Sequence, residues 1–406
     1  MARIVIVGGS LGGLLAANML TRAGHEVTVL EKATSSLDGR GAGIVTHQLL
    51  VAAMERCGVK MDESLGVAVS ERVILGSDGA VLDRVTVPQV LSSWSRLYAL
   101  LLAVFNPRQY VQGAAVSQVR QSADGVTVLC EDGRRFEADL VVASDGIRSA
   151  VRAQLAPEIQ AEYAGYVAWR GVCDESVLSQ HTLNTVFNTF SFCAPPGELI
   201  IAYPVAGAGN SIAVGQRRYN YVWYRPTSGD EELQALLTDA DGNYYPHGIP
   251  PNKVAWRQVA AVRQAARELL APQLAEVLEK TAQPFFQPIY DCSSSKLAFG
   301  RVALMGDAAF VARPHVGMGV TKAAEDAMAL TDLIALHGAT PQALLVFEQQ
   351  RLPPAQAVVQ RARVLGNYMR DHGKAGTGNM TRTMMLETAI DLSATPLEKI
   401  TDFAQV

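Results

Sequence analysis

The chain has 406 residues, of which 49% are hydrophobic, so it is long enough to form two domains with sizeable cores. Its 35 basic and 39 acidic residues give a net charge of -4, which provides no positive surface for nucleic acid or an anionic membrane. This balance excludes a nucleic-acid-binding protein, and we expect a small-molecule ligand.

The cysteine spacing and the length of the apolar segments further limit the class of protein. The sequence contains five cysteines with no close pair among them, which predicts neither a redox disulfide nor a metal site. No charged leader precedes the first predicted strand, and the most apolar helical stretch, residues 97–105, is about half the length that spans a bilayer. We therefore expect a cytoplasmic protein without membrane anchoring.

The first predicted element is an apolar strand that leads directly into a glycine-rich turn at residues 8–13 and a helix at residues 11–23. Ser10 stands where a G-x-G-x-x-G pattern has its second glycine. A second strand at residues 26–30 ends before Glu31, where an acidic side chain accepts hydrogen bonds from a ribose. The pattern predicts dinucleotide binding; the alternative is an ordinary turn with a solvated Glu31.

Loops and hairpins follow this unit. Residues 38–47 form a second glycine-rich stretch that can pass close to a flat ligand. Residues 72–90 predict hairpin strands, broken at Pro88, and Arg96 opens the apolar helix described above. Three short strands within residues 116–137, separated by Asp-Gly turns, predict a β-meander.

Two further segments, residues 138–146 and 300–309, each contain a buried strand that ends at a carboxylate beside a glycine, Asp145 and Asp307 respectively. In α/β sheets the carboxyl ends of parallel strands form the ligand-binding edge. We therefore expect both carboxylates at the edge that also carries Glu31.

The last third of the chain is predominantly helical. Glycines at residues 317–319 open a predicted helix at residues 320–336, whose N-terminal amides would face the neighbouring loop. The pair Pro353-Pro354 is expected to break the next helix, which restarts over residues 355–371.

Residues 163–285 differ in composition, because aromatic side chains are concentrated among strand-like segments. These aromatics are either cross-strand core pairs or the walls of a pocket for a flat ring. Both interpretations remain open from the residues alone.

The motifs at residues 8–13, 145–146 and 306–307, taken together and in this order, resemble the single-component FAD-dependent aromatic hydroxylases, the family of para-hydroxybenzoate hydroxylase. Residues 163–171 and 313–315 resemble most the branch of the dihydroxypyridine hydroxylases.

The resemblance implies an α/β fold with a Rossmann-like FAD-binding domain and an inserted substrate-binding β-sheet domain. The FAD-binding domain would comprise residues 1–72, 96–162 and 286–350. The substrate domain would comprise residues 73–95 and 163–285, and residues 351–406 would form a C-terminal helix and tail.

The resemblance also implies the activity. The protein would use FAD, NADH or NADPH, and O2 to hydroxylate a hydroxylated ring, expected to be a hydroxypyridine, through a flavin C4a-hydroperoxide. The alternatives are a hydroxylase of phenolic acids or purines, and a non-hydroxylating flavoprotein such as a halogenase or a flavin sensor. The sequence leaves open whether the chain forms a homodimer.

The residue roles follow from the same resemblance. Glu31 would bind the adenosine ribose, Arg96 the pyrophosphate side and Asp307 the ribityl chain, while Asp145 would organise the loop between FAD and the nicotinamide. The expected cofactor contacts are Gly8, Ser10, Leu11, Gly13, Glu31, Lys32, Arg40, Gly43, Arg96, Val116, Asp145, Gly306, Asp307, Pro314, Gly317, Met318 and Gly319. The expected catalytic residues are His47, Tyr203, Pro314 and His315, and the expected substrate contacts are His47, Trp169, Tyr203, Tyr221, Trp223 and His315. Among them, His47, His315 and Tyr203 are the candidates for the base that deprotonates the substrate hydroxyl, a role that suits a histidine titrating near neutrality.

Overall fold

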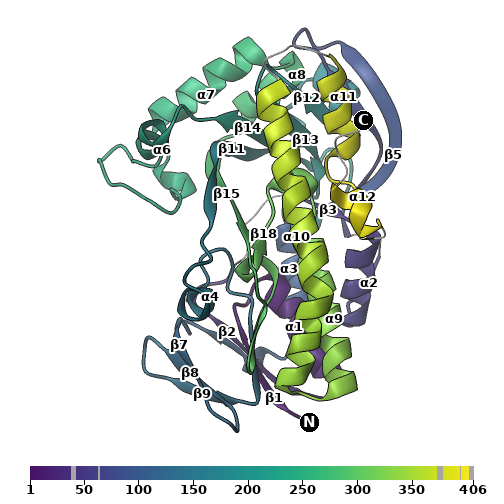
Figure 1. The fold of residues 1–406 in the computed structure, drawn as a ribbon. Coiled ribbons are helices and arrows are strands. Elements are labelled where there is room, and N and C mark those ends of the chain that lie inside the picture. Colours follow the sequence, from purple (N-terminus) through teal and green to yellow (C-terminus); the bar gives the residue numbers. More distant parts are fainter. Residues whose placement is uncertain (38–42, 63–64, 373–377, 394, 402–406) are drawn as a thin grey trace.

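The computed structural model describes residues 1–37, 43–62, 65–372, 378–393 and 395–401. A six-stranded sheet and a nine-stranded sheet lie one above the other in Figure 1, and the long helix α10 (Pro341–His372) runs along both. None of the helices in the described ranges is long and apolar enough to cross a membrane.

The six-stranded sheet contains the predicted dinucleotide-type unit. Its order is β16-β17-β10-β1-β2-β6, and neighbouring strands are parallel except at the edge pair β16 and β17. Buried apolar residues line its central strands, as expected for parallel strands covered on both faces. The strands are β1 (Arg3–Val7), β2 (Glu26–Glu31), β6 (Tyr110–Gln112), β10 (Leu140–Ala143), β16 (Ala298–Phe299) and β17 (Val302–Leu304).

Helices α1 (Leu11–Arg22), α3 (Trp94–Ala103) and α9 (Gly319–His337) pack beside this sheet, with α1 against both α3 and α9. The predicted meander forms a separate three-stranded sheet of β7 (Val116–Gln121), β8 (Val126–Cys130) and β9 (Arg135–Ala138). The remaining helices near this part of the chain are α2 (Gln48–Arg56) and α4 (Ala150–Leu155).

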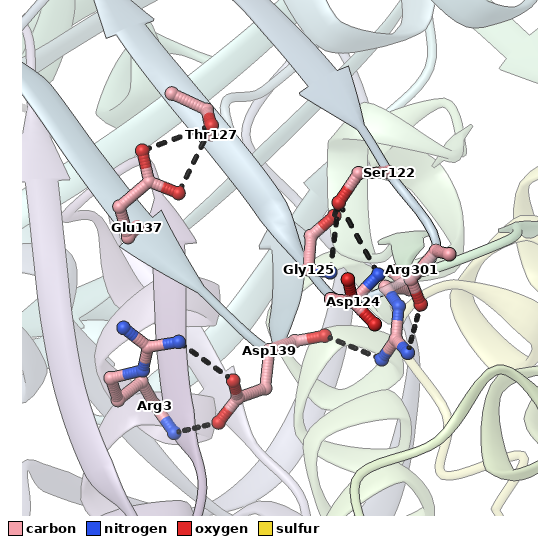
Figure 2. A network of polar contacts seen from close by, with 9 residues as sticks. Arg3, Ser122, Asp124, Gly125, Thr127, Glu137, Asp139 and Arg301 are labelled. Atoms are coloured by element: carbon pink, nitrogen blue, oxygen red, sulfur yellow. Dashed lines mark hydrogen bonds and ion pairs between the residues drawn. The ribbon is translucent and has the colours of Figure 1, made fainter.

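A polar network joins the meander to the amino-terminal edge of the six-stranded sheet (Figure 2). The backbone N–H and Nη2 of Arg3 donate to the two carboxylate oxygens of Asp139 at 2.8 and 3.0 Å. Arg301 donates to the carbonyl oxygens of Ala123, at 2.7 Å, and of Asp139, at 3.3 Å. Because these contacts occupy the amino-terminal edge, the carboxyl ends of the strands are left for a ligand.

The nine-stranded sheet extends beyond the range that the sequence predicted. Its order is β18-β15-β11-β14-β13-β12-β4-β5-β3, so residues before 73 and after 285 also contribute strands. Its strands are β3 (Gly43–Thr46), β4 (Val67–Leu75), β5 (Val81–Ser93), β11 (Glu162–Asp174), β12 (Thr189–Cys193), β13 (Leu199–Val205), β14 (Arg218–Pro226), β15 (Phe285–Ser293) and β18 (Phe310–Val311).

Pro88 does not break its strand as expected. Val69 pairs with Gln89 and Glu71 pairs with Thr86, so β5 has one extra residue at this point, in a bulge that contains Pro88. A proline is tolerated there because a bulge leaves one residue out of the hydrogen-bond ladder.

The two faces of the nine-stranded sheet bury different side chains. One face packs against α7 (Trp256–Leu269) and α8 (Pro272–Lys280), and Tyr219, Tyr221 and Trp223 belong to that core. The other face, with Val222 and Tyr224, packs toward the C-terminal part of the chain. Sequence analysis predicted strands here but not the covering helices, which also include α5 (Gln180–Val186) and α6 (Asp230–Leu236).

The expected helix break at Pro353-Pro354 is wrong, because α10 continues through both prolines. Its first half contributes Leu344 and Phe347 to the core beside the six-stranded sheet, and its second half contributes Leu365 to the core of the other sheet. Packing along its whole length compensates for the backbone hydrogen bonds that the prolines remove. The short helices α11 (Gly378–Glu387) and α12 (Leu397–Thr401) follow.

Candidate active site

A first cavity of about 390 Å³ lies at the carboxyl ends of β1, β2 and β10. It is therefore located at the ligand-binding edge that the sequence predicted. Among the expected cofactor residues, those that line it are Gly8, Ser10, Glu31, Lys32, Val116 and Asp145.

Two glycines in the turn after β1 are sterically required. Gly8 has φ +100°, and a Cβ atom there would lie 2.4 Å from the backbone oxygen of Ser144. At Gly13, a Cβ atom would lie 1.9 Å from the oxygen of Gly8. The turn can therefore press against both α1 and the loop after β10, while Ser10 occupies the N-cap position of α1 and lines the cavity. Leu11 instead packs into the core.

Glu31 is buried and organised by backbone amides. Its Oε2 accepts a hydrogen bond from the N–H of Gly9 and its Oε1 from the N–H of Ala33, each at 2.8 Å. A carboxylate offers about four acceptor positions. Glu31 can therefore accept further hydrogen bonds from a ligand in the cavity that it lines.

Asp145 presents an unused acceptor to the same cavity. Its Oδ2 accepts a weak hydrogen bond from the N–H of Val151 at 3.4 Å, whereas its buried Oδ1 has no hydrogen-bond partner among the described residues. Burial raises the pKa of this carboxyl group. An orphaned acceptor, a glycine cradle and the N-terminus of α1 meet here, and this set fits the sugar and phosphates of a nucleotide.

A second cavity of about 360 Å³ adjoins the first, because Trp94 lines both. One wall is the loop before α9, with Pro314 and residues 317–319 as well as Asp307. The other wall is the nine-stranded sheet. The side chains of its strands β11 to β14 that line the cavity are Arg170, Phe190, Ile201, Tyr203, Val222 and Tyr224.

Asp307 lies in a short turn after β17 and is exposed to the second cavity. The surrounding protein raises its pKa, and the charge of Lys322 opposes this effect. The turn itself is fixed by Asp326, which accepts a hydrogen bond from the N–H of Gly306 at 3.0 Å and pairs with Arg351 at 2.8 Å. Gly306 therefore positions the turn and does not line either cavity.

The loop that carries Pro314 is held rigidly by an arginine. Nε of Arg313 donates to Asp291 at 2.7 Å, and its Nη1 donates to Asn367 of α10 at 3.0 Å. Gly317 ends the loop with φ +66°, a conformation that favours glycine. These contacts place the free amides at the start of α9 beside the cavity.

The segment after α11 closes one side of the second cavity, which the sequence did not indicate. Ala389 lines the cavity, and its N–H donates to the backbone oxygen of His315 at 3.0 Å. The buried Arg72 donates to the backbone oxygens of Met385 and Thr388, each at 2.6 Å, and of Ala389 at 3.1 Å. Burial lowers the pKa of Arg72 to about 10.

Tyr203 is the expected catalytic residue, besides Pro314, that lines the second cavity. Its ring stacks on Phe190 with centroids 4.9 Å apart. A Cβ atom at Gly43 would lie 2.3 Å from the Tyr203 ring, so glycine is required where β3 passes. Burial raises the pKa of Tyr203 to about 12, and the hydroxyl therefore stays protonated and acts as a donor.

The two histidines do not fit the expected role of a base. Neither lines a cavity. His315 Nε2 lies 3.0 Å from the Tyr166 hydroxyl, its ring packs on Tyr224, and burial together with Arg313 lowers its pKa to about 3. Nδ1 of His47 lies 2.9 Å from Thr321 Oγ1, and burial lowers its pKa as well. Their placement in this structure argues against either histidine as the base, and that role stays a prediction.

Three expected substrate contacts, Trp169, Tyr221 and Trp223, lie on the opposite face of the nine-stranded sheet. Side chains alternate along a strand, so their direct neighbours face the cavity instead. This placement argues against contact with a ligand in the second cavity. Arg96 lies in the first turn of α3 and lines neither cavity, and Arg40 lies outside the described residues.

Sequence analysis missed several residues that line the second cavity. Successive side chains of a strand point to opposite faces of a sheet, so some of these residues can be identified once the face of a neighbouring residue is known. Arg170 follows Trp169, and Tyr224 follows Trp223. Others come from segments without a sequence motif: Trp94, Phe190, Gln287 and Ala389.

Known proteins support the class that this geometry suggests. A family model described as FAD binding domain-like matches residues 163–291, and one described as an NAD(P)-binding Rossmann-like domain matches residues 6–51. The chain is 29% identical to a 2,6-dihydroxypyridine 3-monooxygenase of Paenarthrobacter nicotinovorans, over 93% of this chain and 94% of that protein. It is 24% identical to a 3-hydroxybenzoate 6-hydroxylase of Polaromonas naphthalenivorans, over 91% and 88%.

Solved structures agree. The structure of 2,6-dihydroxypyridine-3-hydroxylase from Arthrobacter nicotinovorans matches with a TM-score of 0.85 and 28% identity, covering 91% of this chain and 93% of that one. Klebsiella pneumoniae HpxO, solved with FAD and uric acid, shares the fold with a TM-score of 0.77 and 22% identity, over 98% and 96%.

These similarities define the class: the chain is an FAD-dependent aromatic-ring monooxygenase with the fold of the para-hydroxybenzoate hydroxylase family. Within this class it is similar over nearly its full length to 2,6-dihydroxypyridine 3-monooxygenase, which confirms the resemblance predicted from the sequence. Its cofactor is FAD, with NAD(P)H and O2 as co-substrates.

Proposed function

We propose that this monooxygenase hydroxylates a hydroxypyridine, adding one oxygen atom beside an existing ring hydroxyl. The observation that carries the proposal is the second cavity, whose sheet wall presents Tyr203 and Tyr224 opposite Asp307 and Pro314. An aromatic wall of this kind suits a flat ring. The full-length similarity to the 2,6-dihydroxypyridine 3-monooxygenase supports a pyridine ring.

In this proposal the two adjoining cavities would hold FAD. Glu31 would accept hydrogen bonds from the adenosine ribose, and the N-terminus of α1 would face the pyrophosphate. Asp307 would accept hydrogen bonds from the ribityl hydroxyls, and Pro314 with the amides of residues 317–319 would border the flavin ring. Bound FAD, once reduced by NAD(P)H, would activate O2, which supplies the oxygen atom that is added to the ring.

The protein's own contribution is positioning and water exclusion. Phe190, Tyr203 and Tyr224 hold the ring, while Ile201 and Val222 make the sheet wall apolar and keep water away from the reacting atoms. Because the hydroxyl of Tyr203 stays protonated, it donates a hydrogen bond to a substrate oxygen rather than taking its proton. No histidine among the described residues borders this cavity, which favours a substrate that arrives already deprotonated.

A substrate screen tests the proposal. The FAD-loaded protein is mixed with NADH or NADPH and a panel of hydroxypyridines, hydroxybenzoates and purines, and both cofactor oxidation and product mass are measured. We expect hydroxypyridines to give oxidation coupled to a product heavier by one oxygen atom. Hydroxylation of hydroxybenzoates or purines alone would refute the pyridine assignment and leave the monooxygenase class intact.

A further inference from the structure

Arg170 brings a positive charge to the sheet wall of the second cavity. It lies on β11, paired with Val222 of β14 and with Phe285 of β15, near the middle of the nine-stranded sheet. Its neighbour Trp169 packs on the opposite face, so the guanidinium points into the cavity that Arg170 lines. A strand of a large sheet is a rigid support for such a group.

The guanidinium has no counter-ion in the part of the chain that the structure describes. Its Nε is buried without a hydrogen-bond partner. Other arginines on this sheet are paired: Arg217 with Glu175 at 2.8 Å, and Arg225 with Glu198 at 3.1 Å. An unpaired charge inside a protein is costly, because burial removes its water without replacing it. A ligand anion would therefore gain an unusually strong partner here.

The groups that face Arg170 leave its charge uncompensated. Tyr203 and Tyr224 lie within electrostatic reach, and burial raises the pKa of both phenols, so both are neutral. Asp307 borders the opposite wall and forms no ion pair with Arg170. Arg313, the remaining charged lining residue, is already paired with Asp291. The sheet wall is thus positive and otherwise neutral.

We propose that Arg170 binds an anionic oxygen of the aromatic substrate and that it selects the deprotonated form of that substrate. The anionic oxygen is either a ring oxyanion, as in an ionised hydroxypyridine, or a ring carboxylate. The inference deepens the proposed function, because it requires an aromatic ring in the same cavity. It also accounts for the lack of a histidine base there, since a substrate that arrives as its anion has already lost its proton to water.

Ligand binding to the FAD-loaded protein tests this inference without turnover. The absorbance change of the bound flavin reports the affinity of 2,6-dihydroxypyridine and of 3-hydroxybenzoate, and of their neutral counterparts 2,6-dimethoxypyridine and 3-hydroxybenzamide. A hydrogen bond to a charged group predicts that Arg170→Met weakens binding of the anions about 10- to 150-fold. Arg170→Lys should retain part of this affinity, and the neutral ligands should be little affected.

Arg218→Met is the matched control, because Arg218 lies on β14, carries the same charge and pairs with Asp174 at the surface, outside both cavities. It should bind all four ligands as the wild type does. The anion whose affinity falls in Arg170→Met shows whether the site recognises a ring oxyanion or a ring carboxylate. Equal affinity of wild type and Arg170→Met for both anions would overturn the inference.

The outcomes separate the two proposals. If Arg170→Met releases FAD, the wild type alone decides, because it must bind at least one of the two anions more tightly than its neutral counterpart. Equal affinities within both pairs would refute the role of Arg170. Arg170-dependent binding of 3-hydroxybenzoate without hydroxylation of any hydroxypyridine would refute the proposed substrate and support the anion site. If the wild type hydroxylates a hydroxypyridine and Arg170→Met binds both anions with unchanged affinity, the proposed substrate is supported and the anion site at Arg170 is refuted.

Discussion

Replacing Asp307 by alanine should weaken FAD binding while leaving the folded protein without FAD at least as stable as before, because the folded protein raises the pKa of this carboxyl group. The carboxylate is exposed to the second cavity and makes no hydrogen bond or ion pair with any described residue, so the substitution removes no protein contact. A hydrogen bond to a charged group contributes about 1.5–3 kcal/mol, which corresponds to about 10- to 150-fold in affinity. Flavin fluorescence titration of the FAD-free protein measures this affinity.

Asp326 provides the control, because it lies close by but is buried and bonded to the protein. Asp326→Ala would leave the N–H of Gly306 without its acceptor and deprive the buried Arg351 of one of its two carboxylates. Losing a hydrogen bond to a charged group in this way costs about 1.5–3 kcal/mol, so the unfolding temperature of the FAD-free protein should fall. The reasoning would be refuted if Asp307→Ala lowered that temperature similarly, or if it bound FAD with wild-type affinity.

Three further predictions follow from the pKa values and from the C-terminal segment. Burial lowers the pKa of His315 from 6.5 to about 3, so the unfolded chain binds this proton more readily between these pH values. The free energy of unfolding should therefore fall by about 1.4 kcal/mol per pH unit as the pH drops from 6.5 towards 3, and His315→Gln should remove that part of the slope in urea unfolding. Tyr203→Phe should weaken substrate binding about 2- to 10-fold without moving the pH profile of kcat/KM, since the phenol is protonated up to about pH 12; a shifted profile would contradict this. Arg72→Met removes the donor to three carbonyl oxygens and should make the segment around Ala389 sensitive to limited proteolysis while FAD stays bound; wild-type resistance would show that Arg72 does not hold it.

The parts of the fold that depend on local sequence could be predicted. The order of strand, glycines and helix around Gly8 and Gly13 is visible in the sequence itself, and the contact that requires Gly13 is with the nearby oxygen of Gly8. The contact that requires Gly8 is with the distant Ser144, so only the structure explains that position. The apolar strands that precede Asp145 and Asp307 reflect burial on both faces of a parallel sheet. Glu31 comes directly after a predicted parallel strand, so its place at the ligand-binding edge could also be predicted.

The parts that depend on distant packing could not be predicted. The aromatic cluster was recognised, but Trp223 and Tyr224 are adjacent on one strand, and only the three-dimensional structure shows which of them faces the cavity. The continuity of α10 through Pro353 depends on two cores far apart in the chain. Ala389 reaches the site because Arg72, more than 300 positions earlier, anchors it.

The most direct test of the central claim uses isotopically labelled O2. FAD-loaded protein is incubated with NAD(P)H, 2,6-dihydroxypyridine and the labelled gas, and the product is analysed by mass spectrometry. The proposed function predicts a trihydroxypyridine that carries one labelled oxygen atom, formed in proportion to the NAD(P)H consumed. NAD(P)H oxidation that yields only hydrogen peroxide with every hydroxypyridine, or a product whose new oxygen comes from water, would contradict it.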